Sequence, residues 1–170
     1  MIALVLCICL YGCSANNDAP AYSTETETGA NGEIYVYKTA TDDSGTLEFR
    51  CNALKVINHT YTFEYKRGVQ FELYPFVKNI SDSDFKYKRS GVTLLYCGEY
   101  LMQPSYICVD DAIYSEPLIL KSRQQVCILN EAYRVPDDAP SGSYDLKITI
   151  RDENGDPVSA VIKDFLKVID

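Results

Sequence analysis

Apolar and polar residues alternate with a period of two along most of the chain, which is typical of strands that bury one face. The alternating or apolar runs cover residues 34–37, 47–51, 61–65, 69–73, 92–97, 106–109, 118–120, 126–129, 144–150 and 158–168. Pro75 is expected to interrupt the fourth run, as at a sheet edge or bulge. No stretch keeps a 3.6-residue period long enough for a core helix, and residues 110–114 are expected to form only a short turn.

Gly, Asn, Asp, Ser and Pro stand between these runs and predict the turns. The expected turns lie at 43–45, 67–68, 79–84, 90–91, 136–142 and 154–155. The Asn154-Gly155 pair is the strongest short hairpin signal in the chain. Many short strands at regular spacing predict an all-β antiparallel fold, and a sandwich rather than a barrel.

Residues 135–146 (VPDDAPSGSYDL) make a Pro- and Gly-rich corner that enters a strand at Tyr144. Residues 71–80, followed by the polar turn 81–84, read as a second strand and its end. Together they resemble immunoglobulin-like and fibronectin-like domains, in which a tyrosine hydroxyl bonds to nearby backbone before the penultimate strand. The resemblance covers residues 69–170 by pattern, and residues 33–66 would add an N-terminal strand or hairpin. The chain has no Trp, so the buried tryptophan of antibody-type domains is missing.

The chain opens with ten apolar residues (MIALVLCICL), about half the length needed to span a bilayer and typical of an export signal. The sequence Leu10-Tyr11-Gly12-Cys13 then resembles the lipobox of bacterial lipoproteins. This resemblance implies that residues 1–12 are removed and that Cys13 carries diacylglycerol and palmitate. Tyr11 is larger than the usual residue, and the missing basic start would be explained by translation from upstream of Met1. The alternative is that residues 1–13 form a buried first strand or helix.

Residues 14–32 (SANNDAPAYSTETETGANG) contain almost no bulky apolar side chains. Such a segment buries too little surface to offset the entropy of ordering it. We therefore expect residues 13–32 to form a lipidated, flexible polar tether, and residues 33–170 to form one β-sandwich domain on the outer face of a bacterial membrane.

The net charge of −8 argues against nucleic acid as a partner, because phosphate contacts dominate that affinity and require a basic surface. It also argues against peripheral binding to anionic lipid, so the expected membrane contact is the anchor alone.

Four of the seven cysteines lie within the predicted domain, and an even number in an exported domain favours disulfides. Cys97 and Cys108 flank a Gly- and Pro-containing loop and are expected to face each other across a hairpin. Cys51 and Cys127 would then join more distant strands. The alternative is that all four are buried thiols packed as small apolar groups. A zinc site is not expected, since no cysteines are closely spaced and His59 is the only histidine.

Catalytic signals are sparse. His59 lies in a polar turn without a nucleophile motif, so we expect a turn residue and no catalytic residue. Asp152 to Asp156 have oxygens at alternate positions, but the Gly and Glu that an EF-hand needs are replaced by Pro157 and Ile162. The acidic residues at 81–84, 110–111 and 137–138 are expected to be solvated loop charges; the alternative is that loops at one end of the sandwich share a Ca²⁺. We expect no resident cofactor.

The fourteen tyrosines suit half-buried sheet faces, and the alternative is a face that presents rings to a ligand. Three functions are compatible with the sequence. The favoured one is a lipid-anchored, non-enzymatic binding or accessory module for a protein, peptide or glycan. The others are a protease inhibitor of immunoglobulin-like fold and a hydrolase that uses loop carboxylates or a cysteine thiolate.

Overall fold

The computed structural model describes residues 23–29, 32–56, 60–108, 117–128 and 130–170, and in these residues the chain is all-β. They form fourteen strands in two sheets, and every strand pair except one is antiparallel. The described residues include no helix that could cross a bilayer.

Sheet A has the strand order β1-β2-β3-β6-β12-β9, with β4 added to β3 and β11 added to β6. Its strands are β1 (Ser23–Thr28), β2 (Ile34–Thr41), β3 (Leu47–Lys55), β4 (Thr60–Tyr61), β6 (Gln70–Asn79), β9 (Tyr106–Cys108), β11 (Gln125–Cys127) and β12 (Asn130–Arg134).

Sheet B has the order β10-β7-β13-β14-β5, with β8 added to β7. Its strands are β5 (Glu64–Lys66), β7 (Phe85–Cys97), β8 (Tyr100–Met102), β10 (Leu118–Leu120), β13 (Gly142–Asp152) and β14 (Pro157–Ile169). The short strand β5 runs parallel to the end of β14 and is the exception to the antiparallel pairing.

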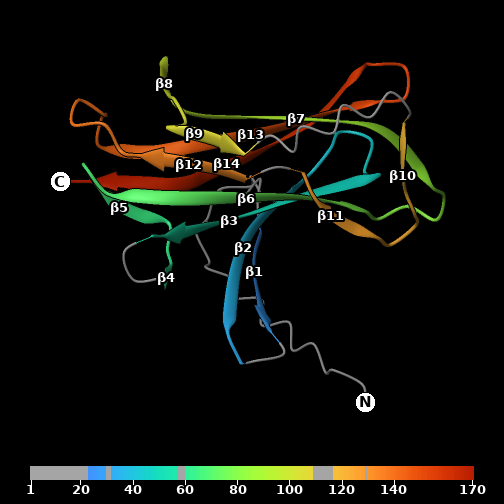
Figure 1. Ribbon diagram of the computed structural model, residues 1–170, viewed down its shortest axis with the longest axis horizontal. Coiled ribbons are helices and arrows are strands. Elements are labelled where there is room, and N and C mark those ends of the chain that lie inside the picture. The colour runs from blue at the N-terminus through green and yellow to red at the C-terminus, as the bar shows by residue number, and fades with distance from the viewer. Residues whose placement is uncertain (1–22, 30–31, 57–59, 109–116, 129) are drawn as a thin grey trace, which may run out of the picture.

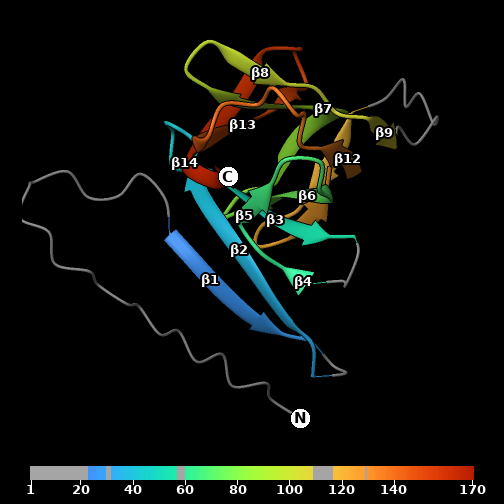
Figure 2. The ribbon, with the colours of Figure 1, turned by 90° about the vertical axis from the view of Figure 1, so that its left-hand side faces the viewer.

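The two sheets bury their inner faces in one core, as the alternation in the sequence predicts. Along β6, Phe71, Leu73 and Val77 point inward and are fully buried, while the alternate residues Glu72, Tyr74 and Phe76 are half-buried on the outer face. Ile148 and Leu166 supply the facing layer from sheet B. Figures 1 and 2 show the two layers, with both long strands of the β13–β14 hairpin in sheet B.

Residues 23–28 correct the expected tether, because they form β1 and pair along their whole length with β2. Thr alternates with Glu in this segment, and the β-branched threonines suit a strand although nothing in it is apolar enough for a core. The hairpin β1–β2 leans away from the two layers in Figure 2. The extra N-terminal hairpin is therefore present, and it begins ten residues earlier than the sequence indicated.

Pro75 does not end its own strand, since β6 continues through it to Asn79. Instead it lies opposite a break in the neighbouring strand. Ile128 donates its backbone N–H to the Pro75 carbonyl (2.9 Å) at the point where β11 gives way to β12. The nitrogen of Pro75 faces the same side of the strand as its carbonyl, so the missing donor coincides with the break.

Two further local expectations are corrected. The run at 61–65 is divided between β4 in sheet A and β5 in sheet B. Residues 90–91 lie inside the long strand β7, where the register with β13 shifts between Thr149 and Arg151, so the expected turn is a β-bulge.

Two turn predictions are confirmed. Asn154-Gly155 joins β13 to β14, with Gly155 at φ 94° and its N–H bonded to the Asp152 carbonyl (3.1 Å). The hydroxyl of Tyr144, fully buried as a residue, donates to the Pro140 carbonyl (3.0 Å) at the Pro-rich corner.

Candidate functional site

The most distinctive feature of sheet A is a fork beside β3. One edge of β3 is covered along its whole length by β6. On the other edge, β2 pairs with residues 48–51, and β4 pairs with Leu54 and Lys55. Because two strands share one edge, β2 pairs with β3 only from Lys38 onward, and its residues before Lys38 lie apart from β3. We call the space between β2 residues 34–37 and β4 the fork.

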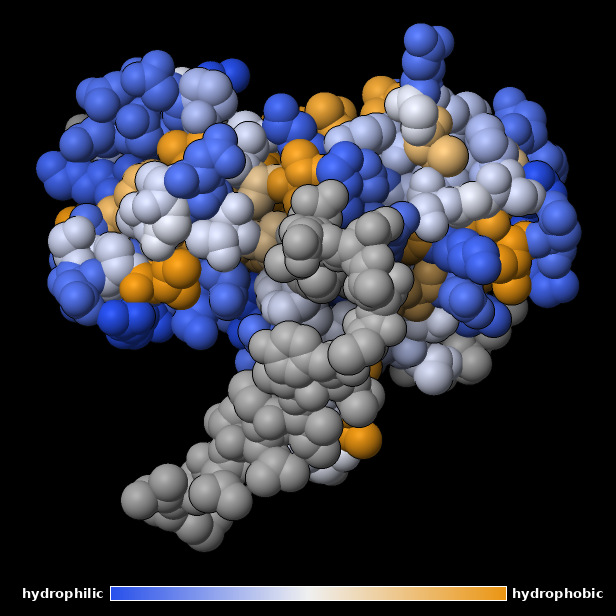
Figure 3. Space-filling view, turned by 180° about the vertical axis from the view of Figure 1, so that it is seen from behind, coloured by the Kyte–Doolittle hydropathy of each residue, from blue (hydrophilic) through white to orange (hydrophobic). Residues whose placement is uncertain are grey.

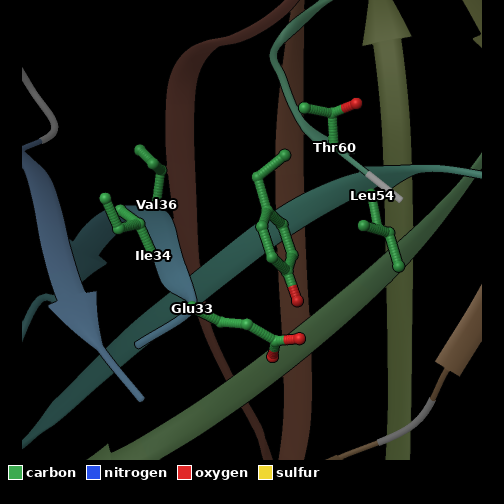
Figure 4. A pocket seen from close by; sticks show the side chains of 6 residues that line it. Glu33, Ile34, Val36, Leu54 and Thr60 are labelled. Carbon is green, nitrogen blue, oxygen red and sulfur yellow. The ribbon is translucent and has the colours of Figure 1, made fainter. Parts of the chain in front are cut away.

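A pocket of about 530 Å³ lies in the fork, within the size range of small-ligand clefts. It is lined by Glu33, Ile34, Val36, Leu54, Thr60 and Tyr61. Figure 4 shows Glu33, Ile34 and Val36 entering from the start of β2, and Leu54 and Thr60 from the opposite side. The pocket is thus apolar on both walls and carries a carboxylate at one end.

Four tyrosines gather around the fork on the outer face of sheet A. The rings of Tyr35 and Tyr61 contact each other across the fork, with centroids 5.2 Å apart. Tyr37 packs edge-on against Phe76, and Tyr74 donates its hydroxyl to Glu72. Tyr37 is buried and the other three are half-buried, which is the burial expected for rings that line a sheet face.

Glu33 influences the nearest phenols. Tyr35 donates to the Glu33 carboxylate (2.7 Å), and this bond raises the pKa of Tyr35. Burial, and then the charge of Glu33, raises the pKa of Tyr61. Both rings therefore stay neutral at physiological pH, and their faces keep the negative quadrupole of a neutral aromatic ring.

Arg50 on β3 fixes the hairpin to the sandwich. Its side chain is 3% exposed, and one guanidinium nitrogen contacts Glu27 (2.7 Å) and Glu25 (3.0 Å) of β1. A second nitrogen donates to Gln125 of β11 (2.8 Å), and the guanidinium carbon lies 4.4 Å from the centroid of the Tyr37 ring. Arg50 thus ties four strands together through two carboxylates, an amide and an aromatic face.

Three buried polar atoms on β3 have no hydrogen-bond partner among the described residues. They are the carboxylate oxygen Oε1 of Glu48, the guanidinium nitrogen Nε of Arg50 and the amide oxygen Oδ1 of Asn52. Asn52 is 3% exposed and precedes Leu54 by two residues on the same face of β3. Burial raises the pKa of Glu48, as do the charges of Glu25 and Glu27, while Lys78 and Arg50 lower it. Glu48 Oε1 lies 4.0 Å from Arg50 Nε and 3.9 Å from Lys78 Nζ, so two cations face this carboxylate.

A second polar cluster lies between the sheets. Glu131 on β12 points into the core, is 4% exposed, and accepts hydrogen bonds from Thr93 of β7 and from Tyr133 (2.9 Å). Burial raises the pKa of Glu131 to about 7, against the opposing effect of the Tyr133 hydrogen bond. Burial, and then the charge of Glu131, raises the pKa of the fully buried Cys51 thiol. Strongly shifted groups often mark active sites, but solvent does not reach this cluster, and it does not form a binding surface.

The expected disulfides are corrected. Cys51 and Cys97 carry free thiols. Strands β3 and β11 flank β6 on opposite sides, which separates Cys51 from Cys127 by two strand spacings, or about 9.6 Å, beyond the reach of a disulfide. Cys97 pairs with Tyr100 in sheet B, whereas Cys108 pairs with Asn130 in sheet A, so the two do not face each other across a hairpin. Cys51 matches the alternative of a buried thiol.

The acidic side chains of the turns accept hydrogen bonds from backbone N–H groups of their own turn or form ion pairs with arginines. The Asp152 carboxylate accepts the backbone N–H groups of Asn154 and Asp156, which makes the Asp152–Asp156 segment a hairpin turn. Asp82 lies 2.7 Å from Arg123. In the parts of the chain that the structure describes, no three His, Cys, Asp or Glu side chains are placed to share a metal ion. Cys13, His59 and Asp110-Asp111 lie outside the described residues, as does the signal at 1–12.

Large apolar side chains are exposed at two other places. Val92 (55%), Leu94 (40%) and Leu101 (42%) lie on the outer face of sheet B, and Ile119 (56%) lies on the edge strand β10. On the face turned to the viewer in Figure 3, hydrophobic groups occur in separate spots among hydrophilic ones. Ile34 is the most exposed of the large apolar residues, at 60%, and it belongs to the fork pocket.

Sequence reasoning missed Arg50, Glu131 and the fork. Arg50 occupies an outward position of an alternating strand. Its burial depends on β1, and the sequence predicts that the residues of β1 belong to the flexible tether. Glu131 is in phase with Tyr133 and Val135, a pattern that places its carboxylate on the buried face.

The chain matches no known protein-family model, and a comparison with curated proteins gives no match. The geometry of the site is therefore the basis for interpreting it.

Replacing Arg50 with Met should lower the free energy of unfolding by about 2 kcal/mol, because it leaves two carboxylates and an amide without their shared donor. Amide protons of β1 should exchange faster, since β1 contacts the sandwich through this guanidinium. Hydrogen exchange and denaturant unfolding measure both effects. Arg134→Met is the control, because Arg134 is half exposed and lies 3.8 Å from Asp137. Equal effects of the two substitutions would contradict the role of Arg50.

Glu131 should make the protein less stable as pH rises. Its pKa is raised on folding, from 4.5 to about 7, so the folded state binds more protons between these values. The contribution of Glu131 to the free energy of unfolding is therefore largest below pH 4.5 and falls until the pH passes 7. Denaturant unfolding at pH 5 and pH 8 gives the free energy of unfolding of Glu131→Gln and of the unmodified chain. The variant should gain free energy of unfolding relative to the unmodified chain, and this gain should be about 2–3 kcal/mol larger at pH 8 than at pH 5. A gain independent of pH would contradict this titration.

Proposed function

We propose that this chain is a lipid-anchored, extracytoplasmic binding module of immunoglobulin-like fold, without enzymatic activity, that holds a ligand in the fork of sheet A. The observation that carries the proposal is the fork pocket, which combines apolar walls, half-buried aromatic rings and a carboxylate. Sites of this kind bind ligands by contact area and orient them with a few polar groups.

The strand order supports the immunoglobulin-like assignment. The path β3-β6-β12-β9 corresponds to the A-B-E-D sheet of such domains, and β7-β13-β14 corresponds to C-F-G. The hydrogen bond from Tyr144 to Pro140 corresponds to the tyrosine corner that precedes the penultimate strand. Hairpin β1–β2 then extends the first sheet beyond the usual strands, and it forms one wall of the fork.

The lipobox-like residues support the anchor. Ser23, the first residue of β1, lies ten positions after Cys13, and a chain of this length spans at most about 35 Å. The hairpin that borders the fork is thus the first described element after Cys13. A ligand in the fork would be held close to the membrane surface.

Replacing Cys13 with Ser should release the protein from the membrane fraction, because the lipid is attached to the cysteine thiol. Fractionation and metabolic labelling with palmitate measure the loss of anchoring and of lipid together. Cys97→Ser serves as the matched control, since that half-buried thiol lies in β7. Retention of the Cys13 variant on the membrane would contradict the anchor.

A photoreactive phenylalanine at Ile34 should cross-link a discrete partner on intact cells, because Ile34 is exposed at the pocket. The same group at Ile119 is the control, since its exposed fraction is nearly equal (56% against 60%) and β10 lies in the other sheet. Mass spectrometry identifies the species attached to each position. The same set of products from both positions would contradict a binding site at the fork.

A further inference from the structure

The geometry points to an extended peptide segment of a partner protein, bearing Arg or Lys, as the ligand of the fork, bound as an added strand between β2 and β4. This inference rests on the proposed binding function of the fork. It adds the chemical class of the ligand and the way in which its backbone is held.

The first ground is the pair of strand edges that border the fork. Residues 34–37 of β2 pair with β1 on one side, and among the described residues no strand pairs with their other side. The same holds for the side of β4 that faces away from β3. Such edges bind extended peptides through main-chain hydrogen bonds.

Strand direction allows one peptide to pair with both edges. β2 and β4 are each antiparallel to β3, so they run in the same direction. A peptide that runs in the direction of β3 is antiparallel to both. It would continue sheet A across the fork, where β2 and β4 share one edge of β3.

The second ground is charge. The pocket contains Glu33, and the rings of Tyr35 and Tyr61 meet beside it. Neutral tyrosine faces and carboxylates both attract cations. Asn52, two residues before the pocket residue Leu54 on β3, adds a buried amide oxygen that has no hydrogen-bond partner among the described residues.

Arg50 shows how this protein accommodates such a group. Its guanidinium is held by Tyr37 and by two glutamates of β1, within 4.4 Å of the ring centroid and 3.0 Å of both carboxylates. The fork pocket offers the same kinds of groups, aromatic ring and carboxylate, around a cavity. A net charge of −8 also favours the approach of a basic partner.

Calorimetric titration of the full chain in detergent tests the inference with defined probes. The first probe is a capped seven-residue peptide of alternating Thr and Arg. The second replaces Arg with citrulline, which keeps the shape and removes the charge. The third carries N-methyl groups at alternate residues, which block strand pairing. The first should bind one to one, and the other two should bind at least about tenfold more weakly.

Variants of the protein locate the site. Tyr61→Leu should lower the affinity for the Thr-Arg peptide about tenfold. Tyr61→Phe should change this affinity by less than about twofold, because Phe keeps the ring. Glu33→Gln should weaken it about threefold to tenfold. Glu99→Gln, the same charge change at an exposed turn between β7 and β8, should leave it unchanged. Thermal unfolding of each variant checks that the fold is kept.

Equal affinity of the Arg and citrulline peptides would overturn the cationic ligand, and equal affinity of the N-methylated peptide would overturn the added strand. Absence of binding by any peptide would overturn both. Cross-linking at Ile34 does not depend on ligand chemistry. A cross-linked partner without peptide binding would therefore contradict this inference but agree with the proposed function. Failure of both experiments would contradict both.

Discussion

The contact between Arg50 and the hairpin β1–β2 is the interaction on which the candidate site depends. Strand β1 has the sequence STETET, which offers no apolar face for the core. It is held instead by Glu25 and Glu27, which close over a guanidinium that lies on the Tyr37 ring. Burying an ion costs several kcal/mol unless charges and hydrogen bonds compensate. Here two carboxylates, an amide and a ring compensate, and both carboxylates remain partly hydrated. A charge cluster thereby replaces the hydrophobic contact that usually attaches a strand pair.

The fork follows from this attachment and from a limit of sheet geometry. A strand has two edges, and β6 occupies one edge of β3 throughout. The other edge is divided between β2, whose residues 38–41 pair with residues 48–51, and β4, which pairs at Leu54 and Lys55. The strands cannot both follow β3, so β2 departs and leaves its residues 34–37 paired only with β1 among the described strands. The same geometry that opens the pocket therefore exposes backbone that can pair.

The alternation of the sequence was sufficient for the all-β class, the antiparallel pairing, most strands, the Asn154-Gly155 hairpin and the Tyr144 corner. These features depend on local chemistry: period two, turn residues and one hydroxyl. The failures depend on distant partners. Residues 23–28 form a strand because they pair with β2 and because their glutamates bind Arg50. Pro75 is tolerated in β6 because the strand opposite it is interrupted between β11 and β12. The fork was likewise beyond sequence reasoning, since the division of one strand edge between β2 and β4 is a property of topology. The expected pairing of Cys97 with Cys108 failed because β7 and β9, with only β8 between them in the sequence, join different sheets.

Charge and tether length fit together in the proposed anchored state. A chain with a net charge of −8 is repelled by anionic lipid headgroups, but the repulsion is screened beyond about 8–10 Å at physiological salt. Ser23 lies ten positions after Cys13, and a chain of this length reaches up to about 35 Å, which is several screening lengths. The domain therefore has room to stand clear of the headgroups. A partner bound to the same surface would then meet the acidic, tyrosine-lined fork at a raised effective concentration.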